Sequence, residues 1–359
     1  MTTVRAVGGP IATPGVAPAG TARSPMGLRP ALSRRSTRSA GVAIGLVSAM
    51  CFGTSGTFGT ALIGAGWSPA GAVFARVLVA ALALTGPAVL ALRGRWRALL
   101  RSAWQVTVYG LVGVAACQVC YFNAIARMPV GISIMLEYLG IVLIVLWLWV
   151  RHGQTPRPLT IGGGVAALGG LALMLNLSGS GGVSLIGVLF ALAAAVSMAV
   201  YFFQSAATPG IGSDRSAGSA GSAGSAGSSA SADEAADLPP VVLTWGGMIV
   251  GAAAIALVGA ARLMPLRFSA SDVALFGGQT SWIVPVLGLG VVAAAVAYVT
   301  GIGAARRLGP KFGSFVAMAE IGFAVLFAWI LLAQTPTALQ FVGGGLILAG
   351  VIAVRLDEP

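Results

Sequence analysis

Charged residues are scarce in this sequence, and their scarcity excludes most classes of soluble protein. Only 8% of the 359 residues are Asp, Glu, Lys or Arg, whereas 57% are hydrophobic and the mean hydropathy is +0.93. Soluble domains typically contain about 25% charged residues. The composition therefore predicts an integral membrane protein. We interpret the formal net charge of +12 as a signal of membrane topology rather than of a nucleic-acid partner.

Side chains that bind metals or cofactors are also rare. The sequence has one histidine, His152, and its three cysteines, Cys51, Cys117 and Cys120, all lie in apolar runs. A haem or zinc site needs a set of such ligands, and no phosphate-binding loop of the G-x-x-x-x-G-K type occurs. We therefore expect no metal, no cofactor and no ATPase activity. The cysteines of CQVC (117–120) are interpreted as small, lipid-compatible residues.

Long apolar runs dominate what remains, and about 20 such residues suffice to cross a bilayer. We count ten runs: 41–63, 69–92, 104–124, 129–150, 158–177, 184–205, 239–261, 282–304, 312–333 and 338–355. The Gly/Ser/Ala-rich tract 206–238 predicts a flexible cytoplasmic linker between the sixth and seventh runs. Residues 1–40 are rich in Ala, Pro, Gly, Ser and Arg and predict a disordered cytoplasmic tail.

Basic residues predict the orientation of these spans, because cytoplasmic loops retain Lys and Arg. With a cytoplasmic N-terminus, 17 basic residues fall in cytoplasmic segments and only Arg127, Arg262 and Arg267 fall in outer loops. We therefore expect both termini in the cytoplasm. Lys311 is the only lysine, and this preference for arginine favours a bacterial source. The predicted location is the bacterial cytoplasmic membrane.

Two patterns occur twice and predict an internal duplication. GQTPRPLTIGGGVAALGG (153–170) follows the fourth run and AQTPTALQFVGGGLILAG (333–350) follows the ninth, while MLEYLG and MAEIGF place a glutamate in each of these runs. Five spans per half would insert the second copy upside down, and the basic loops switch sides accordingly. The predicted fold is all-α, with ten transmembrane helices in two inverted five-helix repeats. The repeats are 41–177, extending to about 205 with the sixth span, and 184–355, interrupted by the linker. The glycine clusters predict close helix packing.

Three charged residues lie within predicted spans: Arg76, Glu137 and Glu320. Each costs a few kcal/mol there unless it is paired or hydrated. At 1.5 Å per residue, Glu137 lies about 12 Å and Arg76 about 10 Å below the outer surface, and Glu320 lies about 12 Å from the cytoplasmic surface. In a core about 30 Å thick, the two glutamates would then border one central cavity near the midplane.

Two interpretations of these charges stay open. Arg76 can form a buried ion pair with Glu137, or a glutamate facing the cavity can bind a substrate ammonium group or exchange a proton. Glu320 is the better candidate for the second role, because its own half has no basic residue within the membrane. Further binding candidates are polar or aromatic residues at similar depth, although Ser and Thr often bond their own backbone or a neighbouring helix. They are Thr54, Ser55, Thr57, Tyr121, Asn123, Tyr298 and Trp245.

The ordered pattern resembles the EamA family of the drug/metabolite transporter superfamily. The resemblance rests on SPAGAVFARVLVAAL (68–82), MLEYLG, GVLFALAAAVSMAVYF (187–202) and MAEIGF, and covers about residues 41–355. The sequence departs from the family at three kinds of position. Phe52 and Met198 stand where tryptophan is common, and Tyr138 and Ile321 follow the glutamates where proline is often found. Gln154 and Gln334 replace the acidic residue that often ends the helix hairpin.

The resemblance implies a carrier, not an enzyme, that moves a small metabolite such as an amino acid, a related amine or a drug-like compound outward across the membrane. The mechanism expected of two inverted repeats is alternating access. Protons are a candidate coupling ion, and the oligomeric state is open. A membrane-embedded transferase, for which the outer loops offer the carboxylate of Asp272, and a non-transporting polytopic membrane protein are the alternatives.

Overall fold

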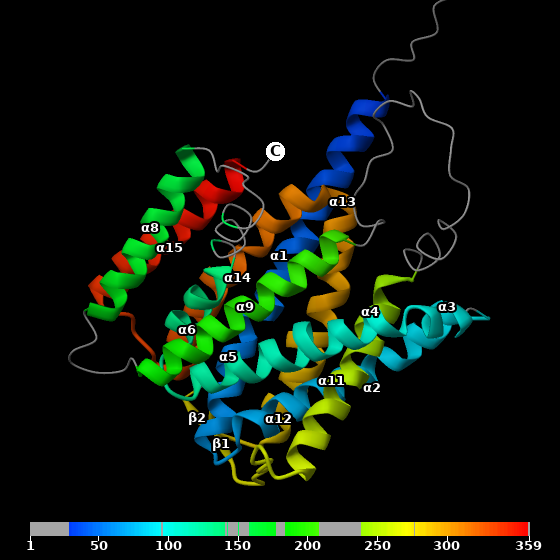
Figure 1. Cartoon of the computed structure of the whole chain (residues 1–359), viewed down its shortest axis with the longest axis horizontal. Coiled ribbons are helices and arrows are strands. Elements are labelled where there is room, and N and C mark those ends of the chain that lie inside the picture. Colours follow the sequence, from blue (N-terminus) through cyan, green and yellow to red (C-terminus); the bar gives the residue numbers. More distant parts are fainter. Residues whose placement is uncertain are drawn as a thin grey trace, which may run out of the picture.

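A computed structural model describes residues 29–94, 96–140, 142, 150, 158–176, 184–207, 238–275 and 277–357 (Figure 1). Helices make up most of these ranges. The elements in chain order are α1 (Arg29–Gly64), α2 (Pro69–Leu92), α3 (Trp96–Arg101), α4 (Ala103–Val108), η1 (Tyr109–Ala116), α5 (Cys117–Ile125), α6 (Val130–Tyr138), α8 (Pro158–Asn176), α9 (Leu185–Ala207), α11 (Pro240–Ala260), β1 (Val273–Leu275), β2 (Gly278–Thr280), α12 (Ile283–Leu287), η3 (Gly288–Val296), α13 (Ala297–Ala317), α14 (Ala319–Leu332) and α15 (Ala338–Asp357).

Within the described chain, five helical segments are long and apolar enough to cross a membrane by length and composition. They are Ser39–Gly64, Pro69–Leu92, Ala103–Ile125, Val241–Ala260 and Ile283–Gly301. Shorter apolar helices occur at four further predicted spans: Pro158–Gly170, Leu185–Met198, Ala319–Leu332 and Phe341–Ala353. The fourth predicted span, 129–150, is represented by α6, and much of its remainder lies outside the described residues, as do 1–28 and most of the predicted linker. The chain is thus a multi-helix membrane protein, and the total of ten spans stays a prediction.

Two expected boundaries are wrong. α1 begins at Arg29, so the last residues of the predicted disordered tail, 29–40, are helical. The loop expected between the eighth and ninth spans is also helical, because α13 runs without interruption to Ala317. The gap between the predicted runs 282–304 and 312–333 contains Pro310, but a proline inside a membrane-protein helix is tolerated where neighbouring groups satisfy the backbone. α13 packs along α1, which supports its extension.

Two helices contain a π-helical segment at corresponding positions in the two halves. η1 lies between α4 and α5 in the first half, and η3 lies between α12 and α13 in the second. A π-helix has a wider turn than an α-helix and is rare, and such segments often occur at functional sites. The sequence patterns gave no signal for either segment.

The two halves exchange contacts in the same pattern. α1 packs against η3, α13 and α14 of the second half, and α9 packs against η1, α5 and α6 of the first. α2 likewise packs on η3, and α11 packs on η1. Equivalent helices also pair, α2 with α11, α6 with α14, and α8 with α15, and Figure 1 shows the last pair side by side at one edge of the molecule. Such reciprocal contacts are expected of a two-fold relation between the halves.

Glycines allow the closest of these approaches. A Cβ atom on Gly170 of α8 would lie 2.5 Å from the carbonyl oxygen of Gly343 on α15, and one on Gly350 of α15 would overlap the carbonyl of Gly163. On α1, a Cβ atom on Gly45 would lie 2.7 Å from the side chain of Val316. Helices in lipid associate through small residues in this way. These positions bear out the prediction that the glycine-rich segments serve packing, whereas a Cβ atom on Gly162 or Gly345 of the same segments would meet nothing within 4 Å.

The loop between α11 and α12, residues 261–282, folds over the N-terminal end of α2 and carries the antiparallel hairpin β1–β2. Ser68, the N-cap of α2, accepts a hydrogen bond from the backbone N–H of Arg267 at 2.9 Å. The indole N–H of Trp67 donates to the carbonyl oxygen of Ser269 at 2.7 Å, and its ring meets that of Phe268 edge-on. Val273 is fully buried, and β1 packs against α1. One end of the bundle is therefore covered.

Candidate functional site

Arg76 lies in the third turn of α2, and only 3% of its surface is exposed. Its guanidinium group donates to the hydroxyl of Ser55 on α1 at 2.7 Å, to the amide oxygen of Gln118 on α5, and to the carbonyl oxygen of Ala293 in η3 at 3.0 Å. It also lies 5.9 Å from the ring centre of Phe122. Arg76 thus connects α2 to three other helical elements, which come from both halves of the protein.

All these hydrogen-bond acceptors of Arg76 are neutral. The ion pair with Glu137, one of the two interpretations that the sequence left open, does not occur among the contacts of the described residues. A buried guanidinium group loses its hydration and needs replacement partners, and these three oxygens supply them. The positive charge is therefore held in place without direct neutralisation by a carboxylate.

Glu137 lies at the C-terminal end of α6 and is only partly buried. The thiol of Cys117, the first residue of α5, donates to Oε1 of Glu137 at 3.2 Å. Cys117 is itself buried and not in a disulfide. The sequence predicts only a small residue compatible with lipid at this position, and the structure adds a polar contact to that role.

Glu320 lies in the first turn of α14, in the second half. The phenol of Tyr138, which follows Glu137 on α6, donates to Oε2 of Glu320 at 2.9 Å. Tyr138 is buried, with 8% of its surface exposed. This hydrogen bond joins the glutamate of the second half to the residue beside the glutamate of the first half.

The two glutamates and Arg76 line one cavity, of about 40 Å³. Its other lining residues come from α1 and α5, and they are Phe52, Ser55, Gln118 and Tyr121. This volume has room for a few water molecules. Pockets that enclose small-molecule ligands usually measure about 300–1,000 Å³, so the cavity in this conformation is too small to hold a metabolite.

The structure therefore brings together the three charged residues singled out from the sequence, Arg76, Glu137 and Glu320. Two of the further binding candidates, Tyr121 and Ser55, line the same cavity. Tyr298 lies one layer behind the lining, because its ring meets the edge of Phe52 at a centroid distance of 4.9 Å. The two glutamates border one cavity, which agrees with the depths calculated from their positions along the helices.

Other candidates have contacts elsewhere. Thr54 donates to the carbonyl oxygen of Cys51 in its own helix at 2.6 Å. The side-chain amide of Asn123 donates to the carbonyl of Val119, also in its own helix, at 2.8 Å. Trp245 donates to the hydroxyl of Thr85 at 3.1 Å and so joins α11 to α2. None of these three lines the described cavity, nor does Thr57, which is fully buried.

Sequence reasoning did not select Gln118, Phe52, Cys117 or Tyr138 as site residues. A signal existed for Gln118, because it is a polar residue in a span close to Tyr121. Phe52 and Tyr138 stood out only as departures from the resembled family. The described residues contain no group of three or more His, Cys, Asp or Glu side chains that could hold a metal ion.

Comparison with protein families identifies the chain. A model of the EamA-like transporter family matches residues 39–176 and 218–356, which together form most of the sequence. The chain belongs to the EamA-like transporter family. This EamA protein is accordingly a transporter of the drug/metabolite type, and members of its family are transporters rather than enzymes. Its family implies a small-molecule substrate and a lipid environment.

Comparisons with curated proteins and with solved structures have different outcomes. No curated protein matches it. A structure described as "Crystal structure of protein" is similar at 22% sequence identity with a TM-score of 0.52, covering 89% of this chain and 100% of that chain. At this identity the likeness concerns the fold alone, and it supports the arrangement of helices described above.

Proposed function

We propose that the protein is a secondary transporter that moves a small amine-containing metabolite, such as an amino acid, a related amine or a drug-like compound, out of the cell by alternating access. The observation that carries this proposal is the cavity shared by Arg76, Glu137 and Glu320. Helices of both halves supply its charged groups, so relative movement of the halves would change its shape and its access to solvent.

The charges of the cavity favour a cationic occupant. When both carboxylates and the guanidinium group are ionised, the site carries one excess negative charge. Because Arg76 is held by three neutral oxygens, it does not neutralise either glutamate through a direct contact. A proton or a substrate ammonium group would remove the excess charge, and competition between the two for the same carboxylates would couple outward transport to inward proton movement.

The small size of the cavity fits a step of such a cycle in which no substrate is bound. The cavity is small, and the loop of residues 261–282 covers the end of the bundle where α2 begins. The excess of basic residues in the loops at the other end supports a cytoplasmic location for both termini, in the inner membrane of a bacterium. The reciprocal contacts of the halves support the proposed inversion of the second repeat, and the domain boundaries given above are part of the same proposal.

Transport into inside-out vesicles tests the proposal. Vesicles that contain the protein are offered a mixture of cell metabolites, and mass spectrometry measures what accumulates with and without an imposed pH gradient. We expect selective accumulation that depends on the gradient. Glu320→Gln should abolish this dependence, because the amide cannot take up a proton, whereas Asp272→Asn in the exposed loop should leave it unchanged.

Two results would count against the proposal. No accumulation under either condition, while a control exporter works in the same vesicles, would exclude export of the tested solutes. Gradient-dependent transport that persists in both Glu320→Gln and Glu137→Gln would show that these carboxylates do not couple transport to protons, although the protein would still be a carrier.

A further inference from the structure

The surface helix α3 has features that the cavity does not use. Its sequence WRALLR (96–101) follows the end of α2, and none of its residues is buried. Trp96 and Leu100 are one turn apart on one face, and Arg97 and Arg101 are one turn apart on the adjacent face. Trp104, in the first turn of α4, follows Leu100 at the same spacing of four residues. α3 therefore has an apolar row beside a basic row.

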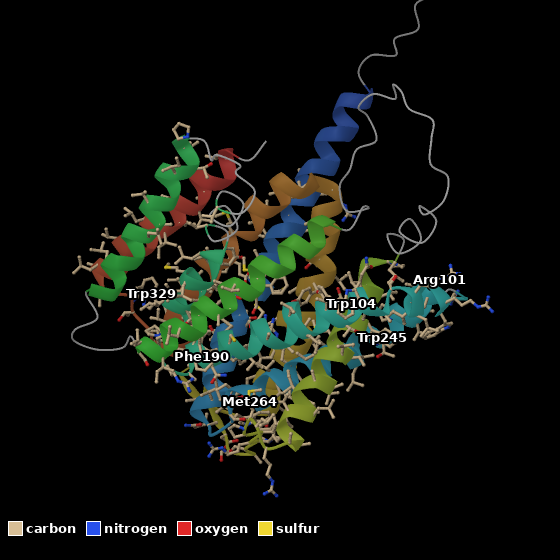
Figure 2. The ribbon with its side chains drawn as sticks, viewed as in Figure 1. Arg101, Trp104, Phe190, Trp245, Met264 and Trp329 are labelled. Atoms are coloured by element: carbon tan, nitrogen blue, oxygen red, sulfur yellow. The ribbon has the colours of Figure 1, made fainter. Side chains whose placement is uncertain are left out.

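Both rows face away from the protein. The exposed fractions are 48% for Trp96, 75% for Leu100 and 78% for Trp104, and Arg97 and Arg101 are exposed as well. Figure 2 shows Arg101 and Trp104 near the end of the bundle formed by α3 and α4.

The opposite side of α3 faces the bundle. Leu99 is only partly exposed, and its side chain lies 3.9 Å from the position of a Cβ atom built on Gly246 of α11. The aromatic and basic side chains of α3 are therefore on the side away from α11.

The position of α3 in the chain places it at a membrane surface. It connects two candidate spans, Pro69–Leu92 and Ala103–Ile125. Tryptophan is enriched at the level of lipid headgroups, and basic side chains near a membrane are attracted to anionic lipids. The segment 93–108 contains four arginines and no acidic residue, so its charge is complementary to an anionic headgroup.

We propose that α3 binds an anionic phospholipid. Arg97 and Arg101 hold the phosphate of the headgroup, because guanidinium groups match phosphate oxygens with paired N–H donors. Trp96, Leu100 and Trp104 contact the glycerol region and the upper part of an acyl chain. The lipid would cover the exposed apolar row and join the protein to one leaflet at the junction of α2 and α4.

Lipid retention in nanodiscs tests this site. The full-length protein is reconstituted with a mixture of phosphatidylglycerol and phosphatidylcholine, and native mass spectrometry counts the lipids retained on release. We expect preferential retention of phosphatidylglycerol that weakens with added salt. The double variant Arg97→Gln/Arg101→Gln should reduce the affinity for phosphatidylglycerol about 30-fold, or about five-fold per arginine. The matched control is Arg262→Gln/Arg267→Gln, at the other end of the bundle, which should retain the lipid.

The apolar row needs its own test. Trp96→Ala should weaken phosphatidylglycerol retention, whereas millimolar inorganic phosphate should not displace the lipid from the unaltered protein. Equal retention of the two lipids, an unchanged affinity in the Arg97/Arg101 variant, or an equal loss in the control pair would overturn the proposal. Displacement by inorganic phosphate would also overturn it, because it would identify an anion site without a lipid chain. Thermal unfolding of each variant shows whether the fold is intact.

Discussion

The contact between α8 and α15 permits a prediction in which one type of substitution has opposite effects at two positions of one helix. Gly350 of α15 is buried against α8, and a Cβ atom there would overlap the backbone of Gly163 and lie 2.7 Å from the backbone nitrogen of Ala167. Gly345, five residues earlier on the same helix, is exposed, and a Cβ atom there would meet nothing within 4 Å. Both glycines lie inside the helix.

The expected magnitudes follow from these surroundings. Alanine is more favourable than glycine in a helix interior by about 1 kcal/mol, so Gly345→Ala should stabilise the protein by up to that amount. At Gly350 the same gain is opposed by overpacking against rigid backbone, which costs about 1–3 kcal/mol. The added methyl group would meet backbone atoms, which cannot move aside as a flexible side chain can, so we expect a cost near the upper end of that range. Gly350→Ala should therefore destabilise the protein by about 2 kcal/mol.

Thermal unfolding of the purified protein in a single detergent measures the difference. The apparent melting temperature should rise or stay level in Gly345→Ala and fall in Gly350→Ala. Gly170→Ala on α8 should also lower it, because a Cβ atom there would lie 2.5 Å from the carbonyl oxygen of Gly343. Equal shifts of the same sign at Gly345 and Gly350 would refute the reasoning, since helix propensity alone would then explain both.

Two further predictions concern hydrogen bonds. Tyr138→Phe removes the donor to the partly buried carboxylate of Glu320, which should lower the free energy of unfolding by about 0.5–1.5 kcal/mol. Unaltered thermal unfolding and unaltered hydrogen exchange in α6 and α14 would contradict this. Trp67→Phe removes the 2.7 Å bond to the carbonyl oxygen of Ser269 and should cost about 0.5–1.5 kcal/mol locally. Hydrogen exchange of peptides from 261–282 should then accelerate about two- to ten-fold, whereas Trp245→Phe, which breaks a bond elsewhere, should leave that loop unchanged.

Patterns of charge and glycine in the sequence predicted much of the arrangement. A charged side chain in a long apolar run must face the protein interior, and for this reason Arg76, Glu137 and Glu320 could be expected to meet. The glycine-rich segments predicted close helix packing, because small residues are what helices in lipid need for such contacts, but they did not predict that α8 and α15 pack against each other. Both inferences depend on strong local constraints that a bilayer imposes on each residue.

The details of the site depend on geometry that no local pattern contains. The carbonyl of Ala293 becomes a partner of Arg76 in η3, and a π-helical segment could not be inferred from residue spacing. Tyr138 reaches Glu320 only because α6 and α14 of opposite halves lie together. Asn123 and Thr54 lie at a suitable depth but bond to carbonyl groups of their own helices. Depth along a helix can be calculated from the sequence, whereas the direction in which a side chain points around the helix axis could not be.

The reciprocal placement of α1 and α9 has a consequence for assembly. Each helix packs against the third and fourth helices of the opposite half, so a half that has entered the membrane by itself leaves its first helix without much of its final protein surroundings. Its share of the cavity would also contain buried polar groups that await partners from the other half. We therefore expect the first half alone to be an incomplete folding unit, which gains its final contacts when η3, α13 and α14 of the second half are inserted.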